Sequence, residues 1–422
     1  MKTLVAGMGL SGMATARFLL DRGLSFETFD ERKDADAVAQ ELDGVVHHQS
    51  APHPSGYDQI VLSPGIAMTH PLVMEAKTVD TPLLSEVEFA SRHAKGPIIA
   101  ITGSNGKSTT TSLIHHLLDH SGLPAVMCGN IGQPFIGQVS DDPDRIYVLE
   151  VSSFQMEHVR DFHPHVGVML NLAADHLDRH GDLETYKQCK FRIFANQTEN
   201  DLAILAPEFV GQIPGNARQI ALPGQECFVR DGFVQLDDSF RIPLHDLPLI
   251  GTHNHSNALF ACAVARHMGL TPDQIVSAFP TFQGLEHRME RVGEYQGRLW
   301  INDTKATNVH AAQAALQSLD CPYVLILGGC DKGERFNGLN FDGHPPRGII
   351  AYGDTAPLIL EDLAHWQPIH IPQFEDACIE AHKRAQEGDA VLLAPACASF
   401  DQFPNFMARG HAFKQLFGRL SG

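Results

Sequence analysis

The chain has 422 residues, a length that predicts two or three domains. Hydrophobic residues make up 43% of it and charged residues 19%, a composition that supports packed cores and excludes wholesale disorder. With 31 basic and 50 acidic residues the net charge is −19, which argues against a nucleic-acid partner but not against small anionic ligands held locally.

The sequence also bears on the cellular compartment of the protein. No apolar run approaches the ~18 residues that a membrane helix needs, and the N-terminus lacks a long apolar segment followed by a small-residue cleavage site. The eight cysteines are scattered without a CxxC pair, so we interpret them as reduced thiols rather than disulfide partners or zinc ligands. We therefore expect a cytoplasmic protein with no membrane partner.

The first block of the chain alternates strands and helices. The pattern predicts a strand over 3–6, a helix over 13–20 and further strands over 25–29, 59–62 and 81–84. A glycine loop, GMGLSG, joins the first strand to the helix. This order is that of a βαβ unit.

The glycine loop has the spacing of a nucleotide-binding turn. Gly7, Gly9 and Gly12 form GxGxxG, and Asp30 follows 18 residues after the last glycine. The spacing matches the dinucleotide fingerprint, although any diphosphate ligand can use such a loop. Three interpretations stay open: an NAD site, a site for a pyrophosphate-linked sugar nucleotide, or a structural turn. The SPGIA loop at 63–67 follows another predicted strand at the same sheet edge.

The second block begins near residue 96 and contains a phosphate loop. The strand IIAI runs into TGSNGKST at 102–109. Glycines let backbone N–H groups surround phosphate oxygens, Lys107 reaches the β- and γ-phosphates, and Ser108 or Thr109 can ligate Mg²⁺. The full pattern has glycine where this chain has Ile101, so the loop is a shortened variant. We assign ATP binding, rather than a tight turn with a surface lysine, to Gly103, Ser104, Asn105, Gly106, Lys107, Ser108 and Thr109.

Three later residues are candidates for holding metal. Glu150 ends the strand IYVLE, and the carboxyl end of a strand faces the ligand crevice of an α/β domain. His176 follows the predicted strand at 166–172, although a single histidine is usually no ligand. Lys190 by itself indicates a helix-surface charge; if it were buried beside Mg²⁺, its amine would have a depressed pKa and could take up CO₂ as a carbamate ligand.

A second nucleotide feature is the segment GTHNHSN at 251–257. Asn254 and Asn257 lie three residues apart, so on a helix they share a face and could bond a base or ribose. A helix cap with a surface asparagine explains them equally well.

The third block carries four short apolar strands, at 299–303, 323–329, 348–353 and 390–396. Bare apolar strands are typical of a parallel sheet that is buried on both faces. Polar loops precede and follow these strands. The candidate site residues in these loops are His287, Arg288, Asp303, Lys305, Thr307, Lys332, Ser399 and Phe406. Any one loop could be a solvated turn, but together they indicate a site for anionic groups.

The blocks predict an α/β fold with three domains, at 1–88, 89–283 and 284–422. Taken together, TGSNGKST, LEVSSFQ, DHLDRH, YKQCKFRIF, GTHNHSN, HRME and NDTKATN resemble the Mur ligase family in order and spacing. The resemblance extends from Gly7 to about Phe417. It implies an N-terminal Rossmann-like domain for a uridine nucleotide, a central P-loop-type ATPase with a mainly parallel sheet, and a C-terminal Rossmann-like domain that closes over both.

The resemblance also implies an activity. It is ATP-dependent amide ligation that adds D-glutamate to UDP-N-acetylmuramoyl-L-alanine through an acyl phosphate, in the cytoplasmic synthesis of peptidoglycan precursors. The implied cofactors are ATP and two Mg²⁺ ions, and we expect a monomer with small-molecule substrates only.

The implied roles fall on individual residues. The resemblance implies catalytic roles for Lys107, Asn130, His176, Lys190 and Arg288. It implies that metal is held by Ser108, Glu150, His176 and a carbamate on Lys190. It implies ATP contacts, besides the phosphate loop, from Asn254, Asn257, Arg288, Asp303 and Lys305. It implies a D-glutamate pocket at Thr307, Lys332, Ser399 and Phe406, with Asn130 close to the reacting groups. The uridine nucleotide falls near Ser11, Asp30, Arg32, Ser63 and Gly65. The segment 201–250 is given no role.

Three alternatives remain. The first is a sister ligase or a folylpolyglutamate-type ligase with another amino acid, against which the segment FDQFPNF argues. The second is an NAD-dependent oxidoreductase, which leaves TGSNGKST and NDTKATN unexplained. The third is a nucleotide-sensing or scaffold protein without catalysis.

Overall fold

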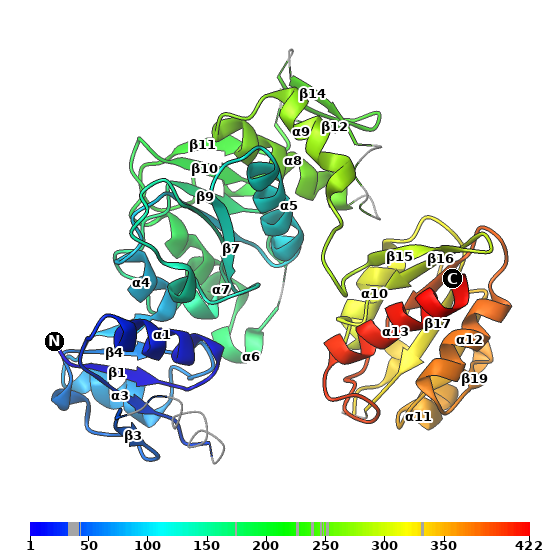
Figure 1. Cartoon of the computed structure of the whole chain (residues 1–422), viewed down its shortest axis with the longest axis horizontal. Coiled ribbons are helices and arrows are strands. Elements are labelled where there is room, and N and C mark those ends of the chain that lie inside the picture. Colours follow the sequence, from blue (N-terminus) through cyan, green and yellow to red (C-terminus); the bar gives the residue numbers. More distant parts are fainter. Residues whose placement is uncertain are drawn as a thin grey trace. The chain divides into compact units, whose positions relative to one another are not determined.

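The computed structural model describes residues 1–32, 42, 44–173, 175–224, 228–237, 240–244, 247, 249, 253–330 and 333–422 (Figure 1). The chain divides into two compact units: Met1–Asp246 with Ser256–Pro280, and Leu247–His255 with Thr281–Gly422. None of the described helices is both long and apolar enough to cross a bilayer.

The first sheet of the first unit is parallel throughout. Its strands are β1 (Thr3–Ala6), β2 (Phe26–Phe29), β3 (His47–His48), β4 (Gln59–Leu62) and β5 (Leu83–Ser85), in the order β3-β2-β1-β4-β5. Helices α1 (Leu10–Asp21), α3 (Pro71–Thr78) and α4 (Glu86–Ser91) alternate with them. The predicted strands and helix are confirmed with small displacements of their ends. The strand order reverses between β1 and β4, so the loops after these two strands lie at the same point of the sheet edge.

The second sheet of this unit has six parallel strands in the order β11-β10-β9-β6-β8-β7. They are β6 (Ile98–Thr102), β7 (Ala125–Gly129), β8 (Ile146–Glu150), β9 (Val166–Met169), β10 (Leu202–Leu205) and β11 (Arg218–Ala221). The helices are α5 (Lys107–His120), α6 (Leu177–His180), α7 (Leu183–Phe191), α8 (His253–His267) and α9 (Pro272–Ala278). Because β8 and β9 flank β6, the loops that follow these three strands meet at one edge.

The segment that carried no assignment from the sequence, 201–250, contributes strands. Its apolar runs form β10 and β11 of the second sheet. A three-stranded antiparallel sheet follows, with β12 (Phe228–Arg230), β13 (Phe233–Asp237) and β14 (Phe240–Pro243). Strands of three to five residues give too short a pattern for sequence reasoning to separate from loops.

The second unit holds a six-stranded sheet in the order β15-β16-β20-β17-β18-β19. Its strands are β15 (Glu290–Tyr295), β16 (Arg298–Asn302), β17 (Tyr323–Gly328), β18 (Gly348–Tyr352), β19 (Ile369–His370) and β20 (Ala390–Leu393). All pairings are parallel except that of the edge strand β15 with β16. The helices are α10 (Val309–Gln317), α11 (Ala356–Asp362), α12 (Phe374–Arg384) and α13 (Phe406–Ser421).

This sheet is buried on both faces, which explains its apolar strands. In β17, Leu325 packs into the core that includes α10 and α11, whereas Ile326 packs into the core that includes α12 and α13. Successive side chains of a strand point to opposite faces, so both faces must be apolar here. Short 3₁₀ helices complete the chain at Pro54–Gly56, Phe135–Gln138, Phe154–Met156, Arg192–Phe194, Pro207–Phe209, Phe279–Thr281, Phe336–Gly338 and Ala364–Trp366.

Candidate active site

The phosphate loop lies between β6 and α5, as the sequence predicts. Gly106 has φ +81°, and a Cβ there would lie 2.3 Å from Oδ1 of Asn257. Gly103, with φ +152°, also has a backbone conformation that L side chains rarely adopt. Helix α5 begins at Lys107. The loop therefore presents the N–H groups of a helix N-terminus on a backbone that only glycine fits closely, which is an anion-binding arrangement.

Two lysines converge on one carbonyl of this loop. The Nζ of Lys107 donates to the carbonyls of Gly103 and Ser104, both at 2.9 Å, and the Nζ of Lys190 donates to that of Gly103 at 2.8 Å. Lys190 is 1% exposed, and its Nζ lies 4.4 Å from the ring centroid of Tyr186. Burial, followed by the charge of Lys107, lowers the pKa of Lys190 to about 7. The structure thus places Lys190 inside the site, and its lowered pKa makes the amine easier to deprotonate than that of an ordinary lysine.

Glu150 ends β8 beside the loop with a carboxylate that is 2% exposed. Its Oε1 accepts from Nδ2 of Asn130 at 2.8 Å, but its buried Oε2 accepts no hydrogen bond from any described residue. The backbone N–H of Asn130 donates to the carbonyl of Glu150 at 2.9 Å, and Gly129 permits this close approach with φ +100°. A buried carboxylate oxygen without a donor is costly unless a cation is bound, so the donor set fits Mg²⁺.

Asn171, just after β9, locks the phosphate loop in place. Its Oδ1 accepts from the N–H of Asn105 at 2.9 Å, and its Nδ2 donates to the carbonyl of Asn105 at 3.1 Å. Its backbone carbonyl accepts from the N–H of Ser104 at 3.1 Å. Sequence reasoning missed Asn171, although its position at the end of a predicted strand was an available signal.

His176 lies on the same loop system but is not buried. It precedes α6 with φ +52°, its side chain is 48% exposed, and its Nε2 lies 3.4 Å from Oδ2 of Asp175. Its ring is 4.8 Å from that of Phe154 and 6.4 Å from that of Tyr186. His176 and Lys190 therefore both contact Tyr186, which the sequence did not single out.

The remaining central residues lie at the helices beside the loop. Ser108 and Thr109 are buried in the first turn of α5. Asn254 and Asn257 are buried residues of α8, and Oδ1 of Asn257 accepts from Oγ1 of Thr110 at 3.3 Å. Asn257 is thus fixed against the phosphate loop itself.

The N-terminal glycine loop is closed by Asp30 and Ser63. Oδ2 of Asp30 accepts from the N–H of Met8 at 2.6 Å, and Nη2 of Arg32 donates to the same oxygen at 2.9 Å. Burial alone would raise the pKa of Asp30, but the hydrogen bonds from Arg32 and Met8 outweigh it and lower the pKa. Oγ of Ser63 donates to the carbonyl of Gly7 at 2.5 Å. Asp30 and Arg32 therefore already pair with each other within the protein.

Two other residues predicted for the uridine nucleotide site lie in or beside these loops. Ser11 lies in α1, and its carbonyl accepts from Oγ1 of Thr15 at 2.9 Å. Gly65 lies in the exposed turn after β4. The structure brings both to the edge where the loops after β1 and β4 lie.

In the second unit, Asp303 follows β16 and faces the turn that carries Arg288. Its Oδ1 accepts from the N–H of Met289 at 3.1 Å. Burial raises the pKa of Asp303 to about 6. The N–H of Lys305, an exposed residue, donates to the carbonyl of His287 at 3.1 Å, and Thr307 follows in the same loop.

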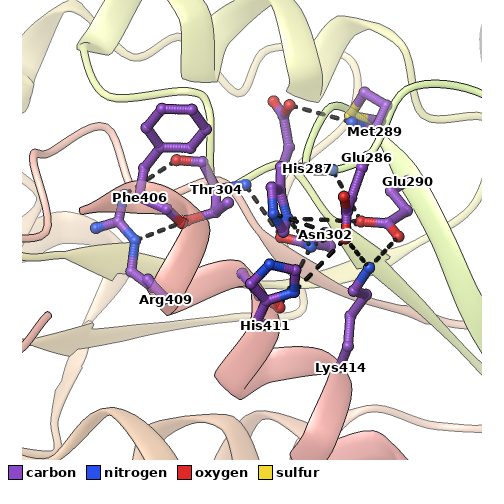
Figure 2. A network of polar contacts seen from close by, with 12 residues as sticks. Glu286, His287, Met289, Glu290, Asn302, Thr304, Phe406, Arg409, His411 and Lys414 are labelled. Atoms are coloured by element: carbon purple, nitrogen blue, oxygen red, sulfur yellow. Dashed lines mark hydrogen bonds and ion pairs between the residues drawn. The ribbon is translucent and has the colours of Figure 1, made fainter. Parts of the chain in front are cut away.

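Helix α13 carries a buried arginine that the sequence did not reveal. Arg409 of α13 is fully buried, and its guanidinium donates to Oγ1 and the carbonyl of Thr304 (Figure 2). The guanidinium also donates to the carbonyl of Cys397 and the hydroxyl of Tyr352. It ties together the ends of β16, β18 and β20. Phe413 and Leu416 are buried on the same helix at spacings of four and seven residues, a pattern that could have indicated an inward-facing Arg409.

Ser399 and Phe406, two residues of the predicted amino-acid site, precede this arginine along the chain. Ser399 is 2% exposed, and its Oγ has no hydrogen-bond partner among the described residues. Phe406 begins α13, and its carbonyl accepts from Oγ1 of Thr304 at 3.1 Å. Lys332 lies outside the described residues.

The sheets and the glycine-rich phosphate loop define a nucleotide-binding α/β protein. Three family models match it: "Mur ligase MurD-like, N-terminal domain" at residues 1–85, "Mur ligase middle domain" at 101–219, and "Mur ligase, glutamate ligase domain" at 287–397. The chain is 35% identical to the UDP-N-acetylmuramoylalanine–D-glutamate ligase of Alkaliphilus metalliredigens, over 99% of this chain and 98% of the relative. It is 38% identical to the enzyme of the same name from Acidobacterium capsulatum, over 98% and 95%.

Solved structures agree in fold. The UDP-N-acetylmuramate-alanine ligase of Thermotoga maritima is similar over 99% of both chains, with a TM-score of 0.61 at 16% identity. The MurF ligase of the same organism, solved with ADP, is similar with a TM-score of 0.58 at 18% identity, over 99% of this chain and 95% of that one. The protein belongs to the Mur ligase family.

Proposed function

We propose that the protein is an ATP-dependent ligase that joins D-glutamate to UDP-N-acetylmuramoyl-L-alanine, in the cytoplasm, during peptidoglycan precursor synthesis. The observation that carries the reaction class is the meeting of three features where β6 and β8 end and where α7 brings Lys190 against the loop after β6. These are a phosphate loop, the unpartnered Oε2 of Glu150, and the buried amine of Lys190. The choice of substrates is supported by the names of relatives that match nearly the whole chain.

The reaction proceeds in two balanced steps. The terminal carboxylate of the nucleotide substrate attacks the γ-phosphorus, the bond to the β-phosphate oxygen breaks, and an acyl phosphate and ADP form. The neutral amine of D-glutamate then attacks the acyl carbon, phosphate leaves with the C–O electron pair, and the amine proton is released. The first step brings together two anions, so fixed positive charge must offset their repulsion.

Side chains of this protein supply the positive charge or hold the groups that carry it. Lys107 and Arg288 stabilise the transferred phosphoryl group, and Asn130 orients Glu150. Ser108, Glu150 and His176, together with a carbamate on Lys190, would hold two Mg²⁺ ions, which supply neutralising charge on the phosphates. A carbamate forms when the neutral amine adds to CO₂ and loses a proton, and burial makes that amine available.

The other assignments follow the three-domain division at 1–88, 89–283 and 284–422, with Rossmann-like outer domains and a P-loop-type centre. The uridine nucleotide binds at the loops of Ser11, Asp30, Arg32, Ser63 and Gly65. ATP is contacted by the phosphate loop, Asn254, Asn257, Arg288, Asp303 and Lys305. D-Glutamate binds at Thr307, Lys332, Ser399 and Phe406. The protein acts as a monomer.

The proposed function is tested by phosphate release from ATP and Mg²⁺ with UDP-N-acetylmuramoyl-L-alanine and a panel of amino acids. We expect release only with D-glutamate, together with a new amide product by mass spectrometry. Release with another amino acid would instead assign the chain to a sister activity. No release with any amino acid would contradict ligation and favour a sensing role. The oxidoreductase alternative finds no support, because all three matched regions are Mur ligase domains.

Replacing Ser399 by Ala should raise the KM for D-glutamate about tenfold or more, since a hydrogen bond to a charged group contributes about 1.5–3 kcal/mol. The KM for ATP should not change. Because the hydroxyl has no partner among the described residues, its removal should not lower the thermal midpoint. Ser277→Ala, an exposed serine of α9, is the control. An equal rise in both KM values would place Ser399 outside the amino-acid pocket.

A further inference from the structure

The turn that carries Arg288 is strained on both sides of that residue. His287 has φ +68° and Met289 has φ +42°, and neither is glycine. Left-handed backbone is uncommon for such residues and persists only where the surroundings impose it. The guanidinium of Arg288 makes no hydrogen bond or ion pair with any residue in the described part of the chain. The strained turn therefore carries a side chain whose charged end forms no direct polar contact within the described chain.

Three successive backbone N–H groups hold this turn. That of His287 donates to Oε2 of Glu290 at 2.8 Å, that of Arg288 to the carbonyl of Leu285 at 3.2 Å, and that of Met289 to Oδ1 of Asp303 at 3.1 Å. Asp303 belongs to the proposed ATP contacts, but Glu290 has no role so far. Glu290 is the first residue of β15, so it couples the turn to the sheet.

Glu290 is itself fixed by two elements that are distant in sequence. Nζ of Lys414, on α13, donates to its Oε1 at 2.9 Å, and Nδ2 of Asn302, at the end of β16, donates to its Oε2 at 2.9 Å. Oδ1 of Asn302 accepts from the N–H of Thr304 at 3.2 Å, which fixes the orientation of the amide. Figure 2 shows Asn302 and Lys414 beside the Glu290 carboxylate. Both of its oxygens are thus engaged, one by a charge and one by two N–H donors.

The same region contains a His/Glu group whose ligand atoms lie within 4.8 Å of one another: Glu286, His287 and His411. It does not suit a metal ion. Lys414 already donates to Oε1 of Glu286 at 2.5 Å, and Nδ2 of Asn302 lies 3.1 Å from Nδ1 of His287. Because Asn302 donates there, the ring proton of neutral His287 lies on Nε2 and no lone pair faces the other two residues. The cation of this cluster is Lys414.

We propose that Glu290, with Lys414 as its counter-charge, is a positioning residue that holds the left-handed turn and so presents Arg288 to the transferred phosphoryl group. The inference rests on the role of Arg288 in the proposed function. The carboxylate does not touch the substrate; it acts through the N–H of His287. Glu290 fixes the direction of the Arg288 side chain, whose positive charge must lie against the negative charge that develops on the transferred phosphoryl group.

The kinetic test uses the full chain and D-glutamate-dependent phosphate release. Glu290→Gln should lower kcat about 10- to 100-fold, since a misplacement of about 1 Å can cost 10²-fold, while the KM for D-glutamate stays within about twofold. Lys414→Met should lower kcat less than Glu290→Gln does. Lys414→Arg, which keeps the positive charge, should retain most of the wild-type kcat. Glu380→Gln, which removes a surface ion pair with Arg384, is the matched control. Wild-type kcat in Glu290→Gln would overturn the proposal.

A double-mutant cycle separates positioning from general stability. In an Arg288→Ala background, Glu290→Gln should cause no further loss of kcat, because its effect passes through the missing side chain. Independent, multiplying losses would overturn the proposal.

Hydrogen exchange tests the turn without any substrate. Glu290→Gln should speed amide exchange in a peptide spanning 284–291 about tenfold, but not in β17 (Tyr323–Gly328). Unchanged exchange at 284–291 would overturn the proposal. A wild-type chain that fails to ligate D-glutamate would contradict the proposed function, whereas the exchange result would still report on the turn.

Discussion

Replacing Lys107 by Ala should abolish turnover, with kcat falling about 10³-fold or more, as for other cations placed on a transferred phosphoryl group. In the structure Lys107 is held by the carbonyls of Gly103 and Ser104, so its ammonium stays at the loop without ligand. Removing it leaves two anions to react without their fixed counter-charge. The measurement is ATP- and D-glutamate-dependent phosphate release under saturating substrates.

The control for this variant is Lys95→Ala, an exposed lysine just before β6. It should retain wild-type kcat, and both variants should show intact folding by circular dichroism. Near-normal turnover of Lys107→Ala would remove the phosphate-loop assignment.

Replacing Lys190 by Ala should inactivate the protein, and a short carboxylate such as acetate should partly restore activity. The variant removes the amine that we propose to form the carbamate, and the space it leaves admits an anionic oxygen ligand. Lys187→Ala is the matched control, because Lys187 lies on the same helix but pairs with Glu184 at the surface. Unchanged activity of Lys190→Ala would exclude the carbamate role.

The assignment of a carbamate to Lys190 also predicts the direction in which carbamate formation changes with pH. Burial, followed by the charge of Lys107, lowers the pKa of Lys190 to about 7, so the amine is mostly neutral above that pH and protonated below it. Only the neutral amine adds to CO₂. A ¹³C-carbamate signal from labelled bicarbonate should therefore grow as pH rises through about 7 and be absent in Lys190→Ala. A signal that persists in Lys190→Ala would move the carbamate to another residue.

Local features of this protein could be predicted well from the sequence. The phosphate loop is one continuous segment, 102–109, and its glycines, lysine and helix start are encoded side by side. Central strands of the parallel sheets, such as β17 and β20, are bare apolar runs, because burial on both faces leaves no room for alternation. Placing Glu150 at a strand end needed only the length of its apolar run.

Roles that depend on distant partners were harder to predict. Asn171 bonds Asn105 across 66 residues, and Arg409 bonds Thr304 across 105. Each joins the ends of strands that are neighbours only because of the order of the sheet. The antiparallel sheet of β12, β13 and β14 was missed because its strands are short and its pairing is decided between strands.

By itself the sequence determined most of the strands and named the candidates for binding phosphate or holding a cation, since these depend on short-range periodicity and side-chain chemistry. The tertiary structure alone decided which of them are buried, oriented and charged. Lys190 is an ordinary helix lysine in the sequence, and only burial beside Lys107 lowers its pKa. Lys414 and Glu290 are 124 residues apart, and only the packing of α13 against β15 makes them a pair, because desolvation and hydrogen bonding act through space rather than along the chain.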